Sequence, residues 1–85
     1  MRQVKNCKVG HFVKYNGILC QVNCFYTNFR GKQATLVEVK HGSRRFFPVD
    51  ATEKVEYLGD HARDEHGNFW VCRRTEQDAF ESRPR

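Results

Sequence analysis

The chain has 85 residues, of which 39% are hydrophobic and 13% aromatic, and its formal net charge is +5. This length allows one compact domain, and the apolar content argues against wholesale disorder. No run of residues approaches the roughly 18–20 apolar residues of a membrane span, and the N-terminus lacks the apolar stretch of a signal peptide. We therefore expect a cytoplasmic protein without a membrane partner.

The charge is unevenly distributed along the chain. Residues 1–49 hold nine Lys and Arg and one acid, a net +8, whereas residues 50–85 hold six Lys and Arg and nine acids, a net −3. A basic half favours a polyanionic partner, most often a nucleic acid. The alternative is a solvated surface that happens to be basic.

The first part of the chain has the pattern of short β-strands. Residues 11–15 alternate between apolar and polar, and the turn Asn16-Gly17 leads to a second run over 18–26. An Asn-Gly pair between two such runs is typical of a β-hairpin. Further strands are expected at 33–40, 44–49 and 52–58. The pattern predicts a mainly β fold, a small five-stranded SH3-like barrel over residues 1–58.

The remainder, residues 59–85, is expected to form an appendage to the barrel. Residues 59–67 are polar and bounded by glycine, which indicates a loop. Residues 68–74 predict an extra C-terminal strand, and residues 75–82 predict a short helical turn with a weak capping pattern. We expect Trp70 and Phe80 to cover one open end of the barrel.

Cys7, Cys20, Cys24 and Cys72 are expected to be free thiols. In an extended strand, Cys20 and Cys24 point to the same face as Val22, so both are expected in the core. Their spacing fits a zinc knuckle only loosely, and no second ligand pair follows. A disulfide is disfavoured without a secretory context. We expect no metal site.

The sequence does not predict an enzyme. The four histidines are scattered, and none is paired obviously with a nucleophile. His61 and His66 lie among Asp60, Asp64 and Glu65, a cluster expected to be solvated rather than to bind a metal. There is no glycine-rich phosphate loop, and a barrel of this size leaves little room for a ligand. We expect no catalysis, no cofactor and no small-molecule substrate.

Basic and aromatic residues cluster in two expected connections. Arg30 and Lys32 lie with Phe29 in the predicted loop 27–32, which could bind phosphates and stack on an unpaired base. We also expect contributions from the following four residues: Lys14, Lys40, Arg44 and Arg45. Whether these residues share one surface depends on strand register.

Two stretches resemble a known family. "CKVGHFVKYNGILCQV" followed by "FYTNFRGKQATLVEVK" is similar to the N-terminal SH3-like (KOW-type) domain of bacterial elongation factor P and its hypusine-bearing counterparts. "VEYLGDHARDEHGNFWVCRRTEQDAFE" is similar to the start of that family's second, OB-type domain, so the chain resembles a factor truncated just inside that domain. In the family, a loop carries a modified Lys or Arg toward the end of tRNA on the ribosome. The resemblance places Lys32 at that position, with Arg30 as the near alternative.

These observations lead to two hypotheses of function. The first is a non-enzymatic module that binds RNA or the ribosome through the basic loop. The second is a small phage- or mobile-element-type protein that binds and modulates a host protein, with Phe29, Phe47 and Trp70 as anchors. Salt discriminates them, because phosphate contacts weaken steeply as salt rises.

Overall fold

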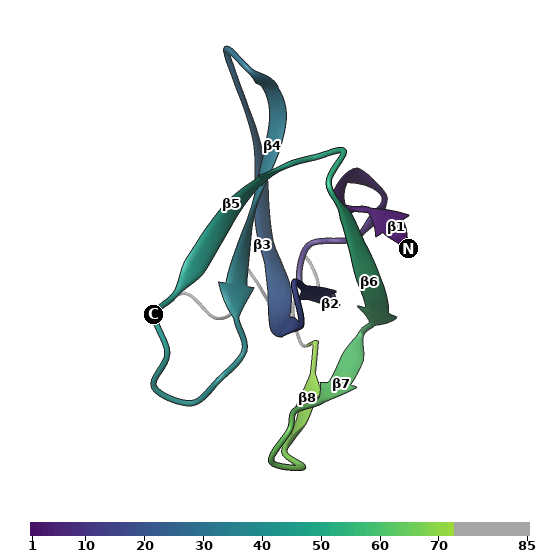
Figure 1. Cartoon of the computed structure of the whole chain (residues 1–85), viewed down its shortest axis with the longest axis vertical. Helices are drawn as coiled ribbons and strands as arrows, with labels where there is room; N and C mark the ends of the chain where they lie inside the picture. Colours follow the sequence, from purple (N-terminus) through teal and green to yellow (C-terminus); the bar gives the residue numbers. More distant parts are fainter. Residues whose placement is uncertain (73–85) are drawn as a thin grey trace, which may run out of the picture.

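The computed structural model describes residues 1–72 and is mainly β, as expected (Figure 1). Six antiparallel strands form one sheet in the order β1-β6-β2-β3-β4-β5, with β1 and β5 as its edges. In chain order these strands are β1 (Arg2–Gln3), β2 (Phe12–Tyr15), β3 (Ile18–Asn28), β4 (Gly31–Glu38), β5 (Phe46–Asp50) and β6 (Lys54–Gly59). A second sheet pairs β7 (His61–Arg63) with β8 (Phe69–Val71).

The sheet bends around a small apolar core. The β2–β3 hairpin turns at Asn16 and Gly17, both with positive φ, as the Asn-Gly pair predicts. The core draws one or more side chains from each of the central strands and from the N-terminal segment: Val4, Cys7, Val13, Cys20, Val22, Ala34, Leu36, Val49 and Val55. The strand expected at 33–40 is confirmed as β4, in which Ala34 and Leu36 are fully buried whereas Thr35 and Val37 are only half-buried.

A short N-terminal segment covers one end of this core and was not expected. Its 3-10 helix η1 (Val4–Asn6) follows β1 and is held by main-chain bonds to the β5–β6 turn. The amide of Val4 donates to the carbonyl of Glu53 (2.9 Å), and the amide of Lys5 donates to that of Ala51 (2.8 Å). Val4 and Cys7 point inward from this segment and are almost completely buried.

The structure corrects three expectations about local structure. Strands β3 and β4 pair as far as Asn28 and Gly31, so the expected loop 27–32 is a tight turn at the end of a long hairpin. The expected loop 59–67 contains strand β7, which pairs with β8. The register between β3 and β4 shifts between Val22 and Cys24, so Cys24 is exposed rather than in the core.

The expected C-terminal strand is present as β8, but it pairs with β7. Trp70 is half-buried on β8, and its ring lies 4.8 Å from that of His41 in the β4–β5 connection. The expected helical turn at 75–82 and Phe80 lie outside the described residues.

Candidate nucleic-acid interface

The β3–β4 hairpin projects from the body of the molecule (Figure 1). Its inner part is anchored in the core by Val22 and Leu36, which pair with one another. Beyond Gln33 the side chains on both strands are exposed, over Tyr26–Asn28 and Gly31–Lys32. The outer hairpin is therefore a two-stranded ribbon whose two faces are both accessible to a partner.

The sequence Asn28-Phe29-Arg30-Gly31 forms the turn at the end of this ribbon. The Asn28 side-chain oxygen accepts a hydrogen bond from the Arg30 amide at 2.8 Å, and Gly31 has a φ of 101°. A turn followed by a glycine with positive φ is a common way to close a hairpin without splaying its strands. The turn leaves Phe29 92% exposed, with the guanidinium carbon of Arg30 5.4 Å from its ring centroid.

Lys32 lies one pair below the turn, opposite Thr27. Its ammonium nitrogen lies 5.2 Å from the centroid of the Phe25 ring, an arrangement in which the ring face attracts the cation. Tyr26, on the other face of the ribbon, is 38% exposed. The predicted site residues Phe29, Arg30 and Lys32 are therefore brought together, with Arg30 rather than Lys32 in the turn itself.

The other predicted basic residues lie elsewhere. Arg44 and Arg45 belong to the β4–β5 connection, which lies at the end of the molecule opposite the hairpin tip (Figure 1). Arg45 is also engaged, because its Nε lies 3.8 Å from the carboxylate of Glu38. Lys14 and Lys40 line a cleft near that same end.

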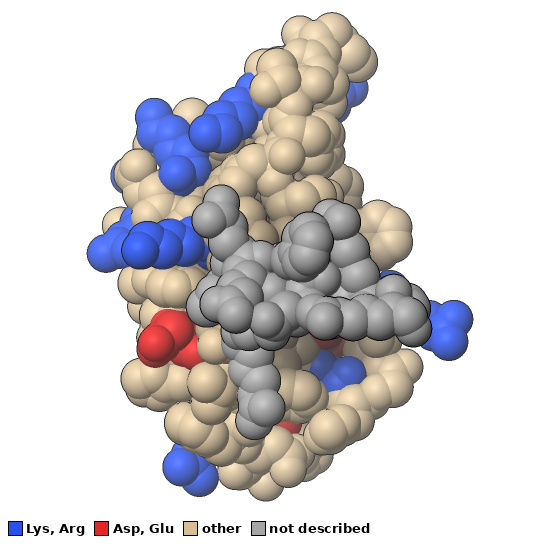
Figure 2. Space-filling view, turned by 180° about the vertical axis from the view of Figure 1, so that it is seen from behind, with Lys and Arg blue, Asp and Glu red and all other residues tan. Residues whose placement is uncertain are grey.

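Four cations that the sequence pattern did not single out lie at the root of the hairpin. Arg2 and Lys54 lie on the paired strands β1 and β6, Lys5 lies on η1, and Lys8 follows that helix. Figure 2 shows Lys and Arg side chains gathered along one flank beside the projecting hairpin. They come from separate segments, so no motif marks them, although the three-residue spacing of 2, 5 and 8 is a signal that could have been noted.

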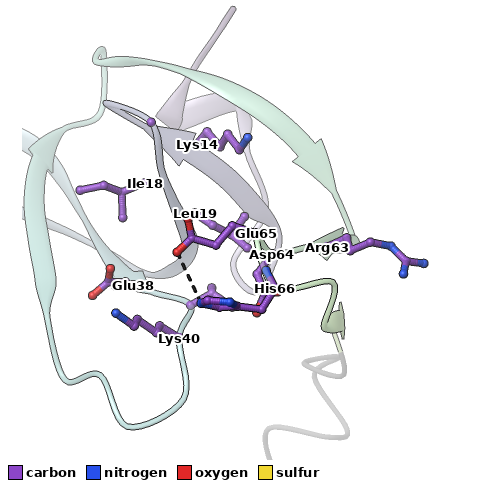
Figure 3. A pocket seen from close by; sticks show the side chains of 11 residues that line it. Lys14, Ile18, Leu19, Glu38, Lys40, Arg63, Asp64, Glu65 and His66 are labelled. Atoms are coloured by element: carbon purple, nitrogen blue, oxygen red, sulfur yellow. Dashed lines mark hydrogen bonds and ion pairs between the residues drawn. The ribbon is translucent and has the colours of Figure 1, made fainter.

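A cleft of about 410 Å³ lies between the β2–β3 turn, the end of β4 and the β7–β8 turn (Figure 3). Three cations and three carboxylates line it together with His66: Lys14, Lys40, Arg63, Glu38, Asp64 and Glu65. Ser43 donates a hydrogen bond to Glu38 at 2.6 Å, and Glu65 lies 3.6 Å from His66. The balance of charges gives this cleft no evident preference for an anion or a cation.

Asp64 organises the β7–β8 turn beside the cleft. Its carboxylate accepts hydrogen bonds from the amides of His66 (2.9 Å) and Asn68 (2.8 Å) and from the Trp70 indole (3.1 Å). Burial acts to raise the pKa of Asp64, but these hydrogen bonds outweigh it and lower the pKa to about 2. The carboxylate therefore serves as a structural acceptor.

The histidines near this turn make local contacts. His61 lies 2.9 Å from the carboxylate of Asp60, and this hydrogen bond lowers the pKa of Asp60. Within residues 1–72, no three His, Cys, Asp or Glu side chains are grouped as a metal ion would require.

Strand β5 is an edge of the sheet among the described residues, and this edge is poorly suited to strand addition. The amide of Glu38 donates to the carbonyl of Arg45, and the amide of Ala51 donates to the carbonyl of Lys32. These bonds show which residue pairs of β4 and β5 are hydrogen-bonded and which are not. Pro48, opposite Thr35, falls at a position whose backbone nitrogen faces outward. Because proline has no N–H, it interrupts the row of donors that an added strand needs.

In the part of the chain that the structure describes, no helix is long and apolar enough to cross a membrane. Comparisons with protein-family models, curated proteins and solved structures returned no match. Function is therefore inferred from the geometry and charge of the hairpin and its surroundings.

Proposed function

We propose that the protein is a non-enzymatic RNA-binding module, with ribosomal RNA among its candidate targets, and that it binds through the β3–β4 hairpin. The observation that carries this proposal is the turn itself. It presents Phe29 almost fully exposed beside Arg30 at the end of a projecting ribbon.

An exposed aromatic ring next to a cation suits an unpaired base and its phosphate. Stacking of a base on an aromatic side chain contributes about 1–3 kcal/mol. Arg30 can contact the neighbouring phosphate, and Lys32 adds a second cation one pair further down the hairpin. Single-stranded or looped RNA offers such bases, whereas the bases of an RNA duplex are stacked inside.

The resemblance to the N-terminal domain of elongation factor P supports the same proposal, because it concerns the same loop. The binding of a host protein is the second hypothesis, but only one of its three expected anchors is freely exposed. Trp70 is held by Asp64 and His41, and Phe47 is half-buried beside Tyr15. Of these three, Phe29 alone would serve as the anchor.

The proposal is tested by co-sedimentation of the protein with ribosomes and with mixed cellular RNA across a salt series. The double variant Arg30→Glu with Lys32→Glu should lose binding, because it replaces both cations of the hairpin tip. The matched control, Lys14→Glu with Lys40→Glu, makes the same charge change beside the distant cleft. It should bind within about twofold of the original chain.

A third variant, Phe29→Ala, separates stacking from charge. It should weaken binding by roughly 5- to 150-fold, the equivalent of 1–3 kcal/mol, without changing the salt dependence. Unchanged affinity in the double variant would remove the hairpin from consideration. Affinity that does not change with salt concentration but is lost in Phe29→Ala would favour a protein partner instead.

A further inference from the structure

The N-terminal segment is joined to the hairpin by a short relay of main-chain hydrogen bonds. The amide of Lys5 donates to the carbonyl of Ala51 at 2.8 Å, and the amide of Ala51 donates to the carbonyl of Lys32 at 3.0 Å. Lys5 and Lys32 thus flank one residue of the β5–β6 turn. In the other direction, β1 pairs Gln3 with Lys54 and Arg2 with Val55.

Lys5, Lys8 and Lys54, named here the basic collar, are carried by backbone that the fold holds in place. Val4 and Cys7 lie on either side of Lys5, and their exposed fractions are only 0% and 5%. The segment therefore cannot shift without opening the core. Arg2 does not belong to the collar, because it is paired with the buried Val55 and its guanidinium carbon lies 3.9 Å from the centroid of the Tyr57 ring, on the face opposite Lys54.

The cations of the collar and of the hairpin tip are available to an external anion. Among residues 1–72, neither the collar residues nor Arg30 and Lys32 form an ion pair within 4 Å. Three exposed carboxylates lie in the same region, Asp50, Glu53 and Glu56, and Asp50 accepts a hydrogen bond from the Gln33 side chain. Five cations against three acids leave a local excess of two positive charges.

We propose that the basic collar is a track for the phosphate backbone of single-stranded RNA, which runs from the N-terminal segment to the hairpin tip. This inference rests on the proposed function and extends it, because the tip would take an unpaired base while the collar holds the adjoining phosphates. Lysine suits this role as a mobile point charge that binds phosphate without reading sequence. The binding should therefore depend on RNA length more than on base sequence.

The test is fluorescence anisotropy with labelled oligouridylates of about 4 and about 12 nucleotides, a range that matches known single-strand site sizes. Titrations span about 50 to 300 mM potassium chloride, since each phosphate contact on a single strand contributes about −0.7 to the slope of log affinity against log salt. Five contacts predict a slope of about −3.5 for the longer oligonucleotide.

The collar variant Lys5→Gln with Lys54→Gln removes two of these contacts and should make that slope shallower by about 1.4. It should leave binding of the shorter oligonucleotide nearly unchanged. The matched control, Lys14→Gln with Lys40→Gln, removes two lysines beside the cleft and should keep the original slope. Trp70 emission and circular dichroism verify that each variant is folded.

The outcomes separate this inference from the function on which it rests. If the collar variant keeps the original slope while Arg30→Glu with Lys32→Glu abolishes binding, the track is refuted and the hairpin stands. If the collar variant alone weakens binding, the collar binds RNA without the hairpin, so the proposed function fails and the track to the hairpin tip fails with it. If neither oligonucleotide binds at low salt, both fail.

A lipid surface is the competing occupant, because Met1 and Val9 are exposed apolar residues of the same segment. The continuity of charge from the collar to the hairpin favours RNA. Co-flotation with vesicles of phosphatidylserine and phosphatidylcholine decides between the two, and no binding is expected. Vesicle binding that is lost in the collar variant would overturn the proposal.

Discussion

At Asn23, strand β3 changes which of its alternate residues point toward the core. Val22 pairs with Leu36 and Cys24 pairs with Thr35, which leaves Asn23 as the extra residue of a bulge. Before the bulge, Cys20 and Val22 point into the core. After it, Cys24 points outward and Phe25 packs against the core. The bulge thus allows one long strand to serve both the core and the projecting hairpin.

The two buried thiols, Cys7 and Cys20, have low reactivity near neutral pH. Burial raises the pKa of Cys20 to about 11, and the nearby Glu38 carboxylate acts in the same direction. Burial also raises the pKa of Cys7, although the positive charge of Arg2 opposes it. A thiol with a raised pKa carries little of the reactive thiolate near neutral pH.

We predict that the thiols differ sharply in reactivity. At about pH 8, iodoacetamide should alkylate the exposed Cys24 readily and Cys20 about 100-fold more slowly than an ordinary thiol, since a pKa raised to about 11 lowers the thiolate fraction by about that factor. Mass spectrometry of the digested protein measures both. Because the folded state disfavours the Cys20 thiolate, stability should fall as pH rises from about 9 toward 11. Equal alkylation of Cys20 and Cys24 in the folded protein would contradict this prediction.

At the scale of elements, a turn can be predicted where its residues favour the backbone conformation that the turn requires. Asn16-Gly17 predicts its hairpin because both residues adopt positive φ at low cost. The turn Asn28–Gly31 carries comparable signals, an asparagine that caps the turn and a glycine at positive φ. The apolar Phe29 and the charged Arg30 between them obscure this pattern, so the sequence alone predicts a longer loop over the whole segment.

Other elements depend on partners distant in sequence and could not be found locally. The two-residue strand β1 forms because it pairs with β6, and β7 forms because it pairs with β8. The bulge at Asn23 is defined only by its register against β4. For the same reason, the sequence indicated Arg30 and Lys32 correctly as neighbours but could not separate them from Arg44 and Arg45, which lie at the far end.

The β7–β8 hairpin should respond to acid. Asp64 accepts several hydrogen bonds within its turn, and its pKa is lowered to about 2, against an ordinary value of about 4. A carboxyl with a lowered pKa favours the folded turn above about pH 4, and this advantage is lost as the pH falls toward 2.

We predict a shift of Trp70 emission in this pH range, because the indole of the chain's single tryptophan donates to Asp64. Asp64→Ala should show the shifted emission already at neutral pH and no further change between pH 4 and 2. The control variant Glu65→Ala, whose side chain is 82% exposed, should titrate as the original chain does. A pH-independent emission of the original chain would contradict the assignment.

At the scale of the whole molecule, the N-terminal segment closes the core and carries the collar at the same time. Val4 is fully buried and belongs to the same cluster as Leu36 and Val55. A chain of 85 residues has a small core and correspondingly modest stability. The loss of one well-packed side chain is therefore a substantial fraction of the free energy of unfolding.

We predict that Val4→Ala lowers the free energy of unfolding by about 2 kcal/mol, because it removes two buried methyl groups and leaves a cavity beneath η1. Val9→Ala is the matched control, since Val9 is 37% exposed in the same segment, and it should cost less than about 0.5 kcal/mol. Urea unfolding followed by circular dichroism measures both. Because η1 also positions Lys5, Val4→Ala should make the salt slope of RNA binding shallower, whereas Val9→Ala should not. Equal destabilisation by the two variants would mean that η1 does not close the core, and the collar would then lose the rigid support on which its role depends.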